Sequence, residues 1–267
     1  MGNILELNKV YNEDCISDNG MCLIEDKSID LILTDLPYGT TRCKWDTIIP
    51  FDELWEQYNR IIKDNGAIVL TASQPFTSAL VMSNPKMFKY DWMWDKGVPS
   101  GHLNAKRMPL RYHESILVFY KKQCTYNRQF TEKPKHLLRP NKYIMAEARN
   151  TISNEKLYGE SKGLYALDND DSVINPKSIL QFDNPKGLKK KDNIHPTQKP
   201  VALFEYLIKT YTNEVDLVLD NCMGSFTTAI ACINTNRNYI GFENDEKYFA
   251  LGQERVRLHN EQLIVNK

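Results

Sequence analysis

The sequence has no apolar run that approaches the roughly 20 residues of a membrane-spanning helix. Its first residues also lack the apolar core that a signal peptide needs. These two absences predict a cytoplasmic protein that has no membrane partner.

Cysteine patterns typical of metal sites are absent as well. The six cysteines are scattered along the chain, without a CxxC pair or a Cys/His cluster. This spacing disfavours a zinc site and predicts free thiols in a reducing compartment. We therefore expect no bound metal.

Net charge is a third feature that the chain lacks, because 34 Lys+Arg balance 34 Asp+Glu. A neutral total by itself argues against a nucleic-acid partner. The distribution argues for one, since residues 121–199 hold 16 Lys+Arg against 9 Asp+Glu. Such asymmetry is typical of a phosphate-binding surface, although a solvated basic face is a common alternative.

The most informative stretch that is present is residues 29–39, which reads IDLILTDLPYG. Its apolar first half has the length and β-branched content of a strand buried on both faces. The run then stops at Asp35, Pro37 and Tyr38. Ligands of open α/β sheets bind beyond the carboxyl ends of the strands, so we expect Asp35 and Tyr38 to face a crevice. An ordinary turn is the alternative, since Asp, Pro and Gly are common turn residues.

Strand and helix patterns alternate along the chain, which predicts α/β units and a mainly parallel sheet. We expect strands at residues 7–14, 29–34, 67–71, 88–94, 115–120, 215–220 and 238–243. We expect helices at 15–25, at 51–63, from 74, from 200, after the turn at 221–226 and from 245. Periodicity breaks in a long loop at 95–114 and is lost over 121–191, which we interpret as an insert between two parts of one fold. A partly disordered or decorative insert is the alternative.

Residues 35–38, DLPY, resemble the DPPY motif of amino-directed DNA methyltransferases, with Leu36 in place of the first proline. An adenine amine is a poor nucleophile because its lone pair is delocalised into the ring. The resemblance implies that Asp35 accepts one amine N–H, while the carbonyl of Leu36 or Pro37, aimed by the rigid proline, accepts the other. Tyr38 would stack on a base that has left the duplex, a contact worth roughly 1–3 kcal/mol. The implied catalytic residues are thus Asp35, Pro37 and Tyr38.

Residues 220–228, DNCMGSFTT, resemble the motif DPFxGSGTT with which the same family binds S-adenosylmethionine. The matching positions are Asp220, Gly224, Ser225, Thr227 and Thr228, and the departures are Asn221, Cys222 and Phe226. Phe226 replaces a glycine where the backbone approaches the ligand closely, which raises a steric question. Glu243 ends the next predicted strand, where an acid accepts both ribose hydroxyls in nucleoside-binding α/β folds.

Two further segments fit the family pattern. Residues 195–200, HPTQKP, resemble the segment before the cofactor turn, and the match implies that Thr197 and Lys199 lie near the methionine end of the cofactor. Asp14 matches an acid near the cofactor's adenine. The implied cofactor residues are Asp14, Asp35, Thr197, Lys199, Asp220, Cys222, Gly224, Ser225, Phe226, Thr227 and Glu243. The pair His113-Glu114 also fits the pattern, without a role that the sequence supplies.

The catalytic strand comes first and the cofactor turn last, as in the circularly permuted beta class of the family. This order implies a Rossmann-like S-adenosylmethionine-dependent methyltransferase fold with a mostly parallel seven-stranded sheet. Residues 1–120 would form its catalytic half, 121–192 an inserted target-recognition region, and 193–267 the cofactor-binding half of the same domain.

The resemblance implies a site-specific enzyme that moves a methyl group from S-adenosylmethionine to the exocyclic amine of a flipped-out adenine in double-stranded DNA. The implied DNA-binding residues are Tyr38, Arg42, Lys44, Lys106, Arg107 and Arg111. A homodimer and a cognate restriction enzyme are open questions.

Several alternatives remain at this point. Cytosine-amine enzymes of the family usually carry Ser in place of Asp35, so the acid favours adenine. Glutamine and structured RNA are more distant substrates, for which Asn typically replaces the Asp. A catalytically silent DNA-binding relative would also keep the fold. Methylation of cytosine carbon 5 is disfavoured, because it uses a thiolate usually displayed in a Pro-Cys pair, and the chain has none.

Overall fold

The structure is a computed structural model that describes residues 5–41, 43, 45–134, 173–183 and 197–265. The chain divides into two compact units, one of Met1–Asn127 with Ser178–Lys267 and one of Arg128–Lys177. The described part of the second unit is an antiparallel pair of β6 (Thr131–Glu132) and β7 (Val173–Ile174). Most of the predicted insert at 121–192 lies outside the described residues, so its boundaries stay a prediction.

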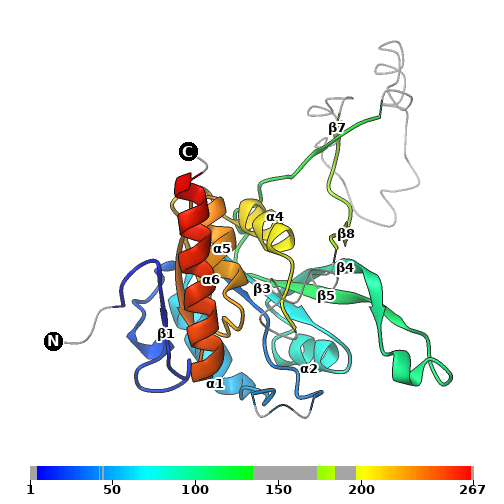
Figure 1. The fold of residues 1–267 in the computed structure, drawn as a ribbon, viewed down its shortest axis with the longest axis horizontal. Coiled ribbons are helices and arrows are strands. Elements are labelled where there is room, and N and C mark those ends of the chain that lie inside the picture. Colours follow the sequence, from blue (N-terminus) through cyan, green and yellow to red (C-terminus); the bar gives the residue numbers. More distant parts are fainter. Residues whose placement is uncertain (1–4, 42, 44, 135–172, 184–196, 266–267) are drawn as a thin grey trace. The chain divides into compact units, whose positions relative to one another are not determined.

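Eight strands form the sheet of the first unit (Figure 1). They are β1 (Lys9–Tyr11), β2 (Ile29–Thr34), β3 (Ile62–Ala72), β4 (Phe88–Ser100), β5 (Arg111–Phe119), β8 (Ile179–Gln181), β9 (Leu217–Asp220) and β10 (Asn238–Phe242). Their order across the sheet is β1-β10-β9-β2-β3-β5-β4-β8. Neighbouring strands are parallel except around β5, which is antiparallel to both β3 and β4.

Helices cover both faces of the sheet (Figure 1). On one face lie α1 (Phe51–Ile61) and α2 (Phe76–Ser83), and on the other α4 (Val201–Tyr211), α5 (Thr227–Asn234) and α6 (Glu246–Val265). Successive side chains of a strand point to opposite faces. In β2, Leu31 and Leu33 join the core with α4 and α5, whereas Ile32 joins the core with α1 and α2. None of the helices that the structure describes has the length and apolar content of a transmembrane span.

The mostly parallel α/β sheet predicted from the sequence is confirmed, and all seven predicted strands are present. The count of seven was one short, because β8 adds to β4 in parallel over Met93–Asp95. A strand of three residues is too short to be predicted from a periodic sequence pattern. Its pairing depends on the exposed edge of β4, which only the folded sheet provides.

Three local predictions were wrong. Residues 15–25 form a short 3-10 turn at Met21–Leu23 instead of a helix. The hydroxyl of Ser17 donates to the carbonyl of Asp14 at 2.8 Å, and the thiol of Cys22 donates to the carbonyl of Asp18 at 3.1 Å. Side chains that bond nearby carbonyls in this way favour turns over helix.

The other two errors concern boundaries. The predicted strand at 67–71 begins at Ile62, because Ile62 pairs with Ile29 ahead of a register shift in β2. Half of the predicted loop at 95–114 is strand, since pairing continues to Ser100 opposite Arg111. The loop that remains is residues 101–110.

Phe226, which replaces an expected glycine, adopts a left-handed conformation at the start of α5, with φ 59° and ψ 28°. Its side chain is 1% exposed and packs toward α6. A Cβ built on Gly252 of α6 would lie 2.2 Å from Cδ1 of Phe226. The steric question raised by the sequence is thus answered within the fold: the ring turns away from the ligand side and fills the space that Gly252 leaves.

We expect Gly252→Ala to lower the free energy of unfolding in urea, because the added methyl overlaps the Phe226 ring. Overpacking typically costs about 1–3 kcal/mol, which exceeds the roughly 1 kcal/mol that Ala gains over Gly within a helix. In a Phe226→Gly background the same change should be neutral or stabilising. An equal loss in both backgrounds would contradict this packing.

Candidate active site

A cavity of about 550 Å³ opens where β2, β9 and β10 end. Asp35 directly follows β2, Asp220 is the last residue of β9, and Glu243 directly follows β10; all three line the cavity. The strands lie side by side in the sheet, so their acids meet at one edge. This confirms that the two distant motifs open onto one pocket.

The carboxylate of Asp35 is held by three side chains. One oxygen accepts the hydroxyl of Tyr38 at 2.7 Å and also the hydroxyl of Thr71. The other accepts the ammonium of Lys199 at 2.6 Å. Asp35 is thus fixed in position by the protein's own side chains, and a substrate N–H would have to join or replace these donors.

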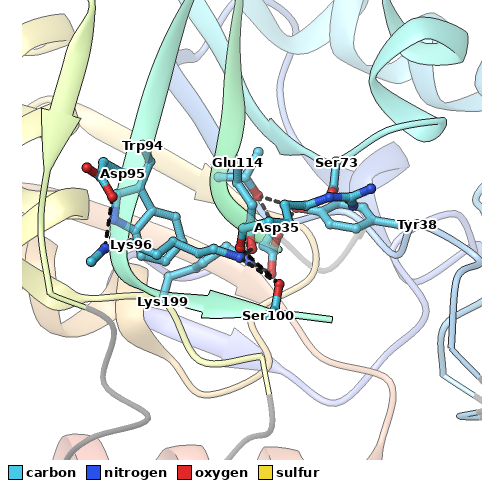
Figure 2. Close-up of polar contacts among 12 residues, drawn as sticks. Asp35, Tyr38, Ser73, Trp94, Asp95, Lys96, Ser100, Glu114 and Lys199 are labelled. Carbon is cyan, nitrogen blue, oxygen red and sulfur yellow. Dashed lines mark hydrogen bonds and ion pairs between the residues drawn. The ribbon is translucent and has the colours of Figure 1, made fainter. Parts of the chain in front are cut away.

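Lys199 belongs to a chain of four alternating charges (Figure 2). Its ammonium lies 3.4 Å from one oxygen of Glu114, whose other oxygen lies 3.2 Å from the ammonium of Lys96. Burial works to lower the pKa of Lys199, but the carboxylates of Asp35 and Glu114 outweigh it, and this pKa rises. Burial works to raise the pKa of Glu114, but Lys199 and Lys96 outweigh it, and this pKa falls. All of these contacts favour the charged forms of Lys199 and Glu114.

The ring of Tyr38 contacts an aromatic side chain and a cation. The ring stacks on Phe76 with centroids 5.2 Å apart, and the ammonium of Lys199 lies 5.8 Å from its centroid. Burial raises the pKa of Tyr38 well above its ordinary range, and the charges of Asp35 and Glu114 add to the shift. The hydroxyl therefore keeps its proton and acts as a donor to Asp35.

The carboxylate of Asp220, at the end of β9, is hydrogen-bonded to other groups of the protein. One oxygen accepts the hydroxyl of Thr34 at 2.7 Å and the backbone N–H of Cys222 at 3.0 Å, and the other accepts the hydroxyl of Thr228. These bonds join the ends of β2 and β9 to the start of α5. Burial raises the pKa of Asp220 to about 6, against the opposing effect of the two hydroxyls.

Glu243, directly after β10, is hydrogen-bonded to the turn at residues 221–226. Its two oxygens accept the backbone N–H of Gly224 at 2.6 Å and that of Asp245 at 2.9 Å. Gly224 has φ +50°, a conformation that suits glycine. Burial raises the pKa of Glu243. Each carboxylate oxygen keeps a second lone pair that can accept a ligand hydroxyl.

Most of the predicted site residues line this one cavity. They are Asp14, Asp35, Pro37, Tyr38, Arg111, Thr197, Lys199, Asp220, Cys222, Gly224, Ser225, Thr227 and Glu243. Phe226 is not among the lining residues, and neither are the exposed Lys106 and Arg107. Arg42 and Lys44 lie outside the described residues. Arg111, at the start of β5, lines the cavity and donates to the hydroxyl of Ser73.

The sequence analysis missed the residues that shape the loop after Gly39. Asp46 is 8% exposed and accepts the backbone N–H groups of Gly39, Thr40 and Thr41 at 2.9, 2.9 and 2.6 Å. The preceding residue, Trp45, meets Tyr248 edge to face at 6.4 Å, and both line the cavity. An aspartate shortly after a proline-glycine turn was the available signal, since such residues bond nearby backbone N–H groups.

A model of the DNA methylase family N6_N4_Mtase matches residues 29–254. The chain belongs to this family. It is a DNA amino-methyltransferase, and the family includes enzymes that methylate adenine and others that methylate cytosine.

Known proteins cover nearly the whole methyltransferase chain. M.HpaI, a type II methyltransferase of Haemophilus parainfluenzae, is 27% identical over 87% of this chain and 69% of its own. The DNA adenine methyltransferase YhdJ of Escherichia coli is 28% identical over 86% of this chain and 76% of its own. The solved structure of an M1.HpyAVI complex with SAM is 27% identical, covers 93% of this chain and 98% of its own, and has a TM-score of 0.59.

Because Asp220 is buried, we expect the free energy of unfolding to fall as the pH rises from about 4 to about 6. The folded pKa of about 6 lies above the ordinary value of 3.8, a difference worth roughly 3 kcal/mol. Between these values the folded state holds a proton that the unfolded state has released, so stability falls as pH rises through this window. Asp220→Asn should lack this fall.

The measurement is urea unfolding from roughly pH 3.5 to 7, a range that begins below the ordinary pKa of Asp and ends about one unit above the folded pKa of about 6. Asp91→Asn, a change at an exposed residue of β4, serves as the matched control and should follow the wild-type profile. A profile of Asp220→Asn parallel to the wild type would show that the carboxyl does not titrate in this way.

Proposed function

We propose that this methyltransferase transfers the methyl group of S-adenosylmethionine to the exocyclic amine of adenine in double-stranded DNA. The observation that carries the proposal is the single cavity that joins the Asp35 motif to the turn between Asp220 and Glu243. A donor bound at the turn and a base held at Asp35 would share one enclosed space. Direct transfer needs such positioning and charge placement rather than a covalent enzyme intermediate.

S-adenosylmethionine fits the residues present at the β9 and β10 ends. Glu243 can accept ribose hydroxyls, and Gly224 brings backbone close without a side chain in the way. Thr197 and Asp14 line the same cavity, in agreement with the roles implied by the family motifs. The M1.HpyAVI structure, a complex with SAM, supports this cofactor. When bound, S-adenosylmethionine supplies an activated methyl group on a sulfonium.

We propose a role for Lys199 other than the one implied by the motif. Its ammonium pairs with Asp35 at 2.6 Å and with Glu114 at 3.4 Å. We propose that Lys199 positions Asp35 instead of serving chiefly as a partner of the cofactor's carboxylate. Asp220 likewise would act by fixing the turn, since its oxygens already accept three donors within the fold, the hydroxyls of Thr34 and Thr228 and the N–H of Cys222.

The base would be read at the other end of the cavity. Asp35 would accept one N–H of the amine, and a carbonyl of Leu36 or Pro37 the second, so that the nitrogen lone pair becomes available to the methyl group. Tyr38 would contact the face of the base. The extruded base recovers through such stacking part of the few kcal/mol spent in leaving the duplex.

Adenine is preferred over cytosine on two grounds. The acid Asp35 stands where the cytosine-amine enzymes usually carry Ser, and YhdJ is named an adenine methyltransferase. We further propose that residues 121–192 read the target sequence and that Arg42, Lys44, Lys106, Arg107 and Arg111 contact the DNA backbone. The type II relatives suggest a restriction partner.

The test is to incubate the protein with S-adenosylmethionine and DNA from a methylation-deficient host, digest the DNA to nucleosides, and identify the product by mass spectrometry. The expected product is the deoxynucleoside of N6-methyladenine. The deoxynucleoside of N4-methylcytosine would show that the substrate is cytosine instead of adenine. Cofactor binding without any methylated nucleoside would favour a silent DNA-binding relative.

We expect Asp35→Ala to lower kcat by at least about a hundredfold, the scale seen when one transition-state hydrogen bond is removed. Affinity for S-adenosylmethionine, measured by calorimetry, should change only a few-fold, because the proposed cofactor contacts lie at the β9 and β10 ends. Equal loss of transfer and of cofactor binding would mean that the roles are misassigned.

Asp30→Ala is a matched control from the opposite end of β2. The carboxylate of Asp30 also forms a lysine ion pair, with Lys63 at 2.7 Å, and accepts the N–H of Leu217 at 3.0 Å, but it does not line the cavity. This variant should lose stability while keeping its kcat at temperatures where it is folded.

A further inference from the structure

The turn between β4 and β5 exposes apolar side chains to an unusual degree. Leu103 is fully exposed at 103%, and Met108 and Val98 are exposed at 56% and 55%. In Figure 1 the two green strands run beyond the other strands of the sheet and end at this turn. Scattered exposed apolar residues are common, but three of them at a projecting turn and the strand end beside it indicate a contact surface.

The tip has a defined backbone despite its exposure. Residues 102–104 form a 3-10 turn that begins after Gly101, whose φ is +90°. The N–H of Asn104 donates to the carbonyl of Gly101 at 2.9 Å, and the N–H of Arg107 donates to the carbonyl of Asn104 at 2.8 Å. Leu103 is thus presented by a turn closed by hydrogen bonds.

The charged side chains within this segment itself are all of one sign. Residues 97–113 contain no acid, and they carry Lys106, Arg107 and Arg111, all exposed. A cationic surface of this kind complements the phosphates of a duplex.

The same hairpin reaches into the cavity at its base. Ser100 pairs with Arg111, and both residues line the cavity, as do Lys96 of β4 and Glu114 of β5. The tip and the site are therefore parts of one antiparallel ribbon. A duplex that delivers a base to Asp35 while its phosphates lie on this ribbon would have Leu103 near the place the base has left.

We propose that Leu103 is an apolar wedge that enters the base stack of duplex DNA and occupies the gap left by the extruded base. This inference rests on the proposed function, because it assumes that the base leaves the helix. Leucine and methionine are among the side chains that proteins insert between base steps, and burial returns hydrophobic free energy that offsets the loss of stacking. Leu103 would act on base extrusion and not on the methyl transfer itself.

The test compares two duplexes that differ only in whether the target base is already unpaired. On a fully paired target, we expect Leu103→Ala to lower kcat/KM by about tenfold, the factor that a buried leucine side chain can contribute. On a target placed opposite an abasic site, the same variant should stay within about two- to threefold of wild type, because that base is less costly to extrude. Leu103→Met should retain activity on both.

Met82→Ala provides the matched control, since Met82 is 72% exposed on α2 and does not line the cavity. Extrusion itself is followed with 2-aminopurine at the target position, whose fluorescence rises on unstacking. Leu103→Ala should reduce this rise, and Met82→Ala should not.

Equal loss on paired and unpaired targets, or no loss on either, would overturn the wedge. A shift of oligomeric state in Leu103→Ala with unchanged 2-aminopurine fluorescence would also overturn it and would assign the tip to self-association. Failure of the proposed function has a different signature, namely no methyl transfer to any DNA by the wild type.

Discussion

The parallel pairing of β2 with β9 is the constraint on which the site depends. The two strands come from distant parts of the chain, yet Leu31 pairs with Val218 and Ile32 with Leu219. The hydroxyl of Thr34 then donates to Asp220 across 186 positions of sequence. Because both strands run in the same direction, their carboxyl ends reach the same edge of the sheet. Asp35 and the turn that follows Asp220 meet there for this reason.

Bringing acids together at a partly enclosed edge has an electrostatic cost that the structure offsets locally. A buried charge without a partner is strongly unfavourable, whereas alternating charges compensate one another. Asp35, Lys199, Glu114 and Lys96 form such a series, with contacts of 2.6, 3.4 and 3.2 Å. Asp220 is stabilised differently, by neutral donors, and burial raises its pKa to about 6 because these donors offset only part of the cost of burying the ionised form. The two acids at neighbouring strand ends therefore have different electrostatic environments.

The antiparallel strand β5 connects this charge series to the outer surface. Glu114 lies on β5 beside the cavity, and Arg111 begins the same strand at the base of the tip. A contact made by DNA at the tip would thus act on the ribbon that also carries Lys96 and Glu114. Under the proposed function, this continuity would connect the contact with the duplex to the positioning of Asp35.

The sequence by itself determined the local elements and the chemistry of the strand ends. Continuous apolar runs such as residues 29–34 identify buried strands, and acids directly after them mark the edge where ligands bind. Local pattern failed where contacts distant in sequence decide the outcome. It did not reveal that β8 would pair with β4, or that Lys199 would bind Asp35 across 164 positions. The accommodation of Phe226 likewise depends on Gly252, which belongs to a different helix. Periodicity reports which face of an element is apolar, whereas the partner that covers that face exists only once the chain has folded.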